Sequence, residues 1–118
     1  MSTRVITHKG KSILYIDYTK AKNQDEMIAV LHEAVDYFKK SPKRVRSLSN
    51  MSEAFMGLEY MVELKRVTPI SLAPNAHKAA IIGIDPLKSI LMKGYNSQNM
   101  GDIKIFDTEQ QALDYLTS

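Results

Sequence analysis

Hydrophobic and polar residues near the N-terminus alternate with the two-residue period of a β-strand. Arg4–His8 alternates weakly, Lys9 and Gly10 supply a turn, and "KSILYIDY" (Lys11–Tyr18) follows. In this second segment both faces are largely apolar, which is typical of an interior strand that is covered on two sides. The two segments together predict a β-hairpin.

The next segment, "NQDEMIAVLHEAVDYFKKSP", changes to the helical period. Asn23 followed by Glu26 forms a capping-box pattern, and Pro42 marks the end of the helix. The apolar residues that repeat at helical spacing are Met27, Leu31, Ala34, Val35 and Phe38.

The rest of the chain alternates short apolar runs with helical patterns. Strands are expected at Arg44–Leu48, in "HKAAIIGI" and in "GDIKIFD", and a Pro-punctuated loop at Val67–Ala76. Three further helices are expected, from about Met51 to Lys65, after Asp85 as N-cap with Pro86 at the first helical position, and after Asp107 with Gln110. The third helix would pack through Leu87, Ile90, Leu91 and Tyr95.

A hairpin followed by alternating helices and strands predicts an α/β fold with a mixed sheet and four helices packed on it. At 118 residues, with neither an internal repeat nor a linker-like segment, the chain is expected to form a single domain over residues 1–118.

The Met-rich helix predicted after Asn50 carries apolar residues on almost every side. One stripe, expected to face the sheet, is Met51, Phe55, Leu58 and Val62; a second, roughly opposite, is Met56, Tyr60 and Leu64, with Met61 between them. A helix on one side of a sheet needs only one apolar face. The following loop, a second copy of the protein, or a partner or apolar ligand must therefore cover the other.

The turn before this helix has candidate chemistry of its own. Asn50 with Glu53 is a second capping-box pattern, and Ser52 falls in the expected first turn. Backbone N–H groups there can bind an anion, and a phosphate on Ser52 would interact favourably with the helix dipole. Simple capping by Asn50 and Ser52 is the alternative. The predicted binding surface comprises Asn50, Ser52, Glu53, Phe55, Met56, Tyr60 and Met61.

Composition and charge exclude several classes of function. Net charge is +3, and the basic run Lys39–Arg46 has no interleaved aromatic residues, so a nucleic-acid partner is not expected. No apolar run is long enough to span a bilayer, so stable membrane insertion is not expected either. The absence of cysteine excludes disulfides and thiolate chemistry, and the N-terminus lacks a secretory pattern, which favours the cytoplasm.

The residues that usually carry catalysis are scattered. His8, His32 and His77 lack metal-ligand spacing, and neither a P-loop nor a glycine-rich dinucleotide motif is present, so no metal or cofactor is expected. Ser52, His77 and Asp17 contain the groups of a hydrolase triad, but no nucleophile-elbow motif accompanies them. The sequence therefore favours a protein that is not an enzyme.

The order of elements, with "ILYIDYTKAK" early, "HKAAIIGID" late and the closing "IKIFDTEQQALDYL", resembles the bacterial SpoIIAA-like proteins. Their fold is similar to that of STAS domains, and is related to CRAL-TRIO lipid-binding domains. The resemblance covers Ile13 to Leu116. STAS proteins that act as anti-sigma-factor antagonists carry a phosphorylatable Ser directly after an Asp. In this chain Asn50 falls at the Asp position, Met51 at the Ser position and Ser52 one residue later.

The resemblance implies a non-enzymatic, regulatory STAS-like domain that acts through protein–protein contact, with a homodimer as one form of that contact. The expected recognition surface is the turn at Asn50–Glu53 with the helix after it. The alternative is a carrier or sensor of a small apolar ligand such as a fatty acid or lipid. That alternative requires a cavity between the Met-rich helix and the sheet, or beneath Val67–Ala76.

Overall fold

A computed structural model describes residues 2–54, 56–85 and 103–118. These residues contain a five-stranded mixed sheet with the strand order β1-β2-β3-β4-β5. The β1–β2 pair is antiparallel, and the pairs β2–β3, β3–β4 and β4–β5 are parallel. The strands are β1 (Thr3–His8), β2 (Lys11–Asp17), β3 (Val45–Asn50), β4 (Ala76–Ile82) and β5 (Ile103–Phe106).

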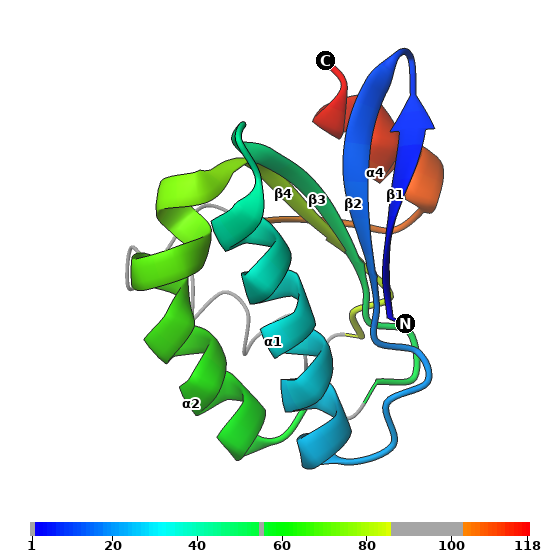
Figure 1. Cartoon of the computed structure of the whole chain (residues 1–118). Helices are drawn as coiled ribbons and strands as arrows, with labels where there is room; N and C mark the ends of the chain where they lie inside the picture. The colour runs from blue at the N-terminus through cyan, green and yellow to red at the C-terminus, as the bar shows by residue number, and fades with distance from the viewer. Residues whose placement is uncertain (1, 55, 86–102) are drawn as a thin grey trace.

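Helices cover both faces of this sheet. Figure 1 shows α1 and α2 next to each other on one face and α4 on the other. Their bounds are α1 (Gln24–Lys40), α2 (Leu58–Val67) and α4 (Glu109–Leu116). The described residues thus contain three of the four α-helices that the sequence predicts. The predicted helix that starts after Asp85 falls in residues 86–102, outside the described residues.

The predicted hairpin is confirmed. Lys9 and Gly10 both have positive φ, 50° and 76°, and connect two strands in which Thr3 lies opposite Ile16 and His8 opposite Lys11. A two-residue turn with positive φ at both positions matches the twist of the strands that it joins.

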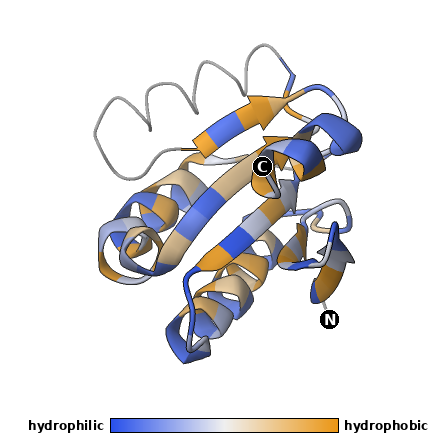
Figure 2. Cartoon of the chain, turned by 90° about the horizontal axis from the view of Figure 1, so that it is seen from above, coloured by the Kyte–Doolittle hydropathy of each residue, from blue (hydrophilic) through white to orange (hydrophobic). Residues whose placement is uncertain are grey.

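The core has two parts, one on each face of the sheet. The larger lies beneath α1 and α2 and includes Leu14, Ile16, Met27, Leu31 and Met51. The smaller lies beneath α4 and includes Ile13, Tyr15, Leu48, Ala112 and Leu116. Consecutive residues of β2 alternate between them, as the strand period requires. Figure 2 shows hydrophobic and hydrophilic bands along the strands.

The helices α1 and α4 are each capped by the side chain of the residue directly before them in the sequence. Asn23 is the N-cap of α1, and its side chain accepts a hydrogen bond from the Glu26 backbone N–H at 2.9 Å, as predicted. For α4 the predicted cap is wrong by one residue, because Thr108 and Gln111 form the capping box in place of Asp107 and Gln110.

Two basic side chains of the sheet cap the other end of α4. Arg46 Nε donates to the Leu116 carbonyl at 3.0 Å, and Lys78 Nζ donates to the Tyr115 carbonyl at 3.1 Å. The last carbonyls of a helix lack partners within it and carry partial negative charge, so two cations there stabilise the end. Arg46 and Lys78 therefore use their positive charges to hold the end of α4.

No helix among the described residues has the length and apolarity needed to cross a membrane.

The segment between β3 and β4 departs most from the prediction. β3 continues to Asn50, and α2 begins at Leu58, so the predicted helical start at Met51 is wrong. After α2 the chain stays helical, with a π-helical turn over Thr68–Leu72 and a 3₁₀ turn over Ala73–Asn75, where a loop was expected.

Candidate ligand cavity and binding surfaces

The apolar face of α2 points the opposite way from the prediction. Tyr60 and Leu64 are 3% and 6% exposed, and Met61 is buried beside them. Leu58 and Val62, which were expected to pack on the sheet, are 78% and 59% exposed. Met56 is partly buried against the same core, and Phe55 lies outside the described residues. The predicted outward face of Met56, Tyr60 and Leu64 is therefore wrong.

The start of α2 is positioned by a residue distant in sequence. Gly57 is the N-cap and contributes no side-chain hydrogen bond. The Gln24 side chain of α1 accepts a hydrogen bond from the Tyr60 backbone N–H at 3.1 Å. A Cβ on Gly57 would overlap that Gln24 side chain. Gln24 thus satisfies one of the unpaired N–H groups at the start of α2, and glycine leaves room for it.

The turn after β3 is held against the end of β4. Met51 N–H donates to the Ile82 carbonyl at 2.9 Å, and the Asn50 side chain accepts from the Ser52 N–H at 3.1 Å. Gly83, with φ of 81°, touches Ser52 so closely that a Cβ would overlap it. Asn50 therefore closes a local Asx turn and is not a helix cap.

This geometry changes the role expected for Ser52. It lies in a turn packed on Gly83, several residues before the first residue of α2, so the helix dipole does not act on it as predicted. Met51, at the STAS phosphorylation position, is 1% exposed and belongs to the core. Glu53 is exposed and has φ of 59°, which for a residue other than glycine is strained.

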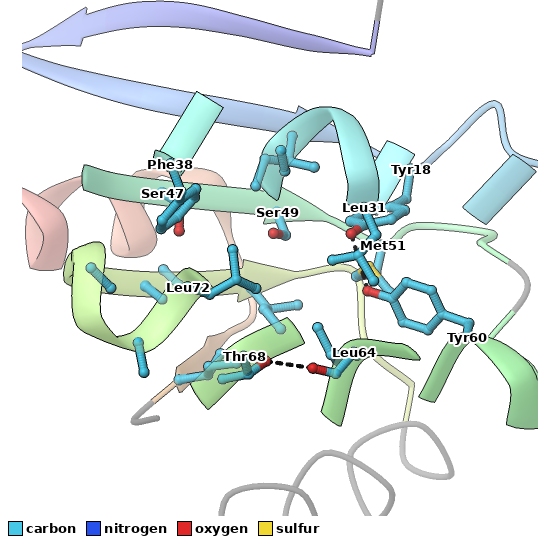
Figure 3. Close-up of a pocket in the computed structure, with 18 residues that line it drawn as sticks. Tyr18, Leu31, Phe38, Ser47, Ser49, Met51, Tyr60, Leu64, Thr68 and Leu72 are labelled. Atoms are coloured by element: carbon cyan, nitrogen blue, oxygen red, sulfur yellow. Dashed lines mark hydrogen bonds between the residues drawn. The ribbon is translucent and has the colours of Figure 1, made fainter. Parts of the chain in front are cut away.

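A cavity of about 90 Å³ lies between the sheet and the layer formed by α1, α2 and the π-helical turn (Figure 3). This is the location that the apolar-ligand hypothesis requires. Its walls are mostly apolar and include Leu31, Phe38, Met51, Tyr60, Leu64 and Leu72. Its floor consists of small residues on two neighbouring strands, which are Ser47 and Ser49 on β3 and Ala76, Ala79 and Ala80 on β4.

The two serines are unusual at the centre of the sheet. Interior parallel strands are normally rich in Val, Ile and Leu. Ser47 is only 4% exposed, yet among the described residues neither its hydroxyl nor that of Ser49 has a hydrogen-bond partner. A buried hydroxyl without a partner destabilises the fold. The sequence contained this signal, because the serines alternate with Leu48 in "RVRSLSN".

Other polar groups that line the cavity are paired. The Tyr60 hydroxyl donates to the Tyr18 hydroxyl at 3.1 Å, and the two rings meet edge to face with centroids 5.6 Å apart. Thr68 Oγ1 donates to the Leu64 carbonyl at 2.6 Å. These bonds leave the two serines as the polar groups of the floor.

A second cluster joins α1 to α2 on the outer surface. The Glu63 carboxylate accepts hydrogen bonds from Arg66 Nε at 2.6 Å and Arg66 Nη2 at 2.8 Å, and it also contacts His32 Nε2. Hydrogen bonds from Arg66 and then from His32 lower the pKa of Glu63 to about 2. His32 is 53% exposed and bound to this carboxylate.

The residues of the imagined hydrolase triad do not come together. Ser52 packs on Gly83 beyond the end of β4, whereas His77 lies at the start of that strand. Burial raises the pKa of Asp17, but hydrogen bonds from Thr19 outweigh it, so the pKa is lowered. Asp17 therefore closes its own turn. The described residues contain no group of three His, Asp or Glu side chains that could hold a metal ion.

Comparison with known proteins identifies the fold. No protein-family profile matches the sequence, and no curated protein matches it. Among solved structures, the chain is similar to an anti-sigma-factor antagonist (STAS) domain protein from Planctomyces limnophilus. The match has a TM-score of 0.59 and 13% identity, and it covers 98% of each chain. The predicted STAS-like fold is thus confirmed. At this identity the similarity concerns the fold alone.

Proposed function

We propose that this chain is a non-enzymatic binding domain of the STAS type, which holds a small apolar ligand between α2 and the sheet. The cavity at Ser47 is the observation that carries the proposal. Its walls are apolar, and its floor presents two hydroxyls that lack partners among the described residues. A ligand with an apolar body and one hydrogen-bonding group would satisfy both features.

The size of the cavity limits the ligand. Its volume of about 90 Å³ is smaller than the roughly 150 Å³ of an engineered cavity that binds benzene. A fatty acid would therefore enter only if α2 and the π-helical turn moved away from the sheet. Such movement would change the outer surface of α2, which gives the domain a means of regulating a partner.

Native mass spectrometry of the purified protein tests this proposal, with decanoic acid added as a probe where no ligand co-purifies. We expect a bound small molecule, and we expect Ser49→Leu to abolish binding because leucine would fill the cavity. Ser12→Leu is the matched control, since Ser12 is exposed on β2 and does not line the cavity. The proposal is contradicted if the protein carries no ligand after purification and binds no added decanoic acid. Equal ligand binding by Ser49→Leu and Ser12→Leu also contradicts it.

A second candidate is contact with a second copy of the chain through the exposed face of α2. Leu58 and Val62 lie one turn apart on this face, with Glu59 near one end of the helix and Lys65 near the other. Antiparallel packing of two α2 helices would cover the apolar pair and place unlike charges opposite each other. This surface replaces the one predicted from the sequence.

Sedimentation velocity over a range of concentrations tests this candidate. We expect a dimer that Leu58→Asp combined with Val62→Asp dissociates, without a change in the circular dichroism spectrum. Val5→Asp is the control, because Val5 is an exposed apolar residue on β1. A monomer at every concentration contradicts self-association and leaves the cavity proposal intact.

A further inference from the structure

A cleft of about 260 Å³ separates α1 from the junction of α2 with the π-helical turn. Its floor contains Val35 and Val67, both buried, and Ile70 forms part of its wall. Ile70 is 69% exposed, although an isoleucine is normally buried. The volume is just below the roughly 300 Å³ at which pockets for drug-sized ligands begin, so the cleft suits a smaller molecule.

Cationic side chains line the same cleft. Arg66 projects from α2 and Lys39 from α1, and the His32 imidazole also lines the cleft. Glu63 binds the Nε and Nη2 edge of Arg66, which fixes the guanidinium and leaves the N–H groups of Nη1 for another acceptor. Holding a donor in position before binding lowers the entropy lost when a ligand binds.

The balance of charge favours an anion. The only carboxylate lining the cleft within the described residues is that of Asp36, which pairs with Lys40 at 2.9 Å. Among the residues that the structure describes, Lys39 has no ion-pair partner. Lys39 therefore presents an unpaired ammonium group on one side of the apolar floor. Arg66, whose charge Glu63 balances, presents the N–H groups of Nη1 on the other side.

We propose that this cleft binds a small organic anion, namely one carboxylate attached to a short apolar chain. The carboxylate would accept hydrogen bonds from Arg66 and Lys39, while the chain would cover Val35, Val67 and Ile70. This site lies outside the cavity beneath α2 and does not depend on the function proposed for that cavity. It gives the domain a second, surface-accessible ligand site.

Titration of the ¹⁵N-labelled protein with sodium hexanoate, followed by NMR, tests the proposal. We expect shifts centred on residues of the cleft, and a Kd on the order of 1 mM for so small a ligand. Acetate lacks the chain and hexan-1-ol lacks the charge, so both are expected to bind the cleft at least about fivefold more weakly. Shifts of equal size at the cleft with hexan-1-ol, or none there with hexanoate, overturn the proposal.

Variants separate this site from its surroundings. Arg66→Gln and Lys39→Gln should each weaken hexanoate binding at least about fivefold, which is the loss of one charge-assisted hydrogen bond. Lys65→Gln, the same loss of charge on the outer face of α2, should leave it unchanged. Lys39→Gln preserves the test if Arg66→Gln disturbs the fold through Glu63. Ser49→Leu should also leave binding unchanged. If it abolishes binding, the anion occupies the inner cavity and the cleft proposal is wrong.

Discussion

The helices α1 and α2 lie next to each other on one face of the sheet, but their N-termini are determined differently. The start of α1 is local, because Asn23 caps it and Glu26 lies one turn later. The start of α2 depends on Gln24 from α1 and on a turn that packs against Gly83, the residue directly after β4. A local start is readable from a short window of sequence, whereas a start made by distant residues is not.

This difference also bears on function. The helix with the non-local start forms one wall of the cavity and carries the exposed apolar face. Few of the contacts at its start are built into its own sequence, so α2 is the element that we expect to move when a ligand enters. The predictions below test this contrast.

The largest effect is expected at Gly83. Gly83→Ala would force a side chain into a left-handed conformation and against Ser52, so we expect a loss of about 3 kcal/mol in the free energy of unfolding. Urea denaturation measures it. Gly10→Ala is the control, since Gly10 has φ of 76° but open space around it. It should cost only about 1 kcal/mol. Equal losses would show that contact with Ser52 is unimportant.

A smaller effect is expected when the two caps are removed. Gln24→Ala and Asn23→Ala should each cost about 1 kcal/mol, since each leaves one helix N–H group without its partner. Amide hydrogen exchange distinguishes them. Gln24→Ala should accelerate exchange at the start of α2, and Asn23→Ala at the start of α1. If Gln24→Ala affects only α1, the start of α2 does not depend on it.

The Gly57 position provides a test of coupling. Gly57→Ala should displace the Gln24 side chain, so it should destabilise the wild type by about 1 kcal/mol. In a Gln24→Ala background the same change should cost about half as much, because the side chain that alanine would meet is gone. A double-mutant cycle by urea denaturation measures the difference. Additive losses would mean that the two residues do not interact.

The sequence predicted those features that depend on neighbouring residues. Both strands of the hairpin, α1 and the order of the strands were predicted correctly, because strand alternation and the Asn23 cap lie within short windows. The error at α2 has a physical cause. Asn50 and Glu53 satisfy a capping pattern, but the backbone there turns against β4, and a single sequence does not show that contact.

The error in the start of α2 determined the error in the candidate site. The helix begins at Leu58 and not at Met51, so Met51 is not part of its apolar stripe. In the helix that forms, Tyr60 and Leu64 face inward and Leu58 faces outward. The cavity lies between this helix and the sheet, which is one of the two locations that the alternative hypothesis of an apolar ligand required. Its floor was not predicted, although Ser47 and Ser49 already broke the apolar pattern of an interior strand.

The smallest effect concerns the link between α1 and α2 at Glu63. Its pKa is lowered from 4.5 to about 2, so its pairing with Arg66 and His32 stabilises the fold above pH 4.5. That contribution is lost as the pH falls from 4.5 to 2, because the unfolded chain takes up the proton first. Both partners are more than half exposed, which limits the contribution to less than about 1 kcal/mol.

Urea denaturation of the wild type and Glu63→Gln measures this contribution at several pH values. The difference in unfolding free energy between them should be fully present above pH 4.5 and should decrease steadily as the pH falls below that value. Glu59→Gln, on the exposed side of the same helix, should show a smaller difference. If the difference for Glu63→Gln does not change with pH, the carboxylate does not join the helices. The position of α2 would then rest on Gln24 and the buried core alone.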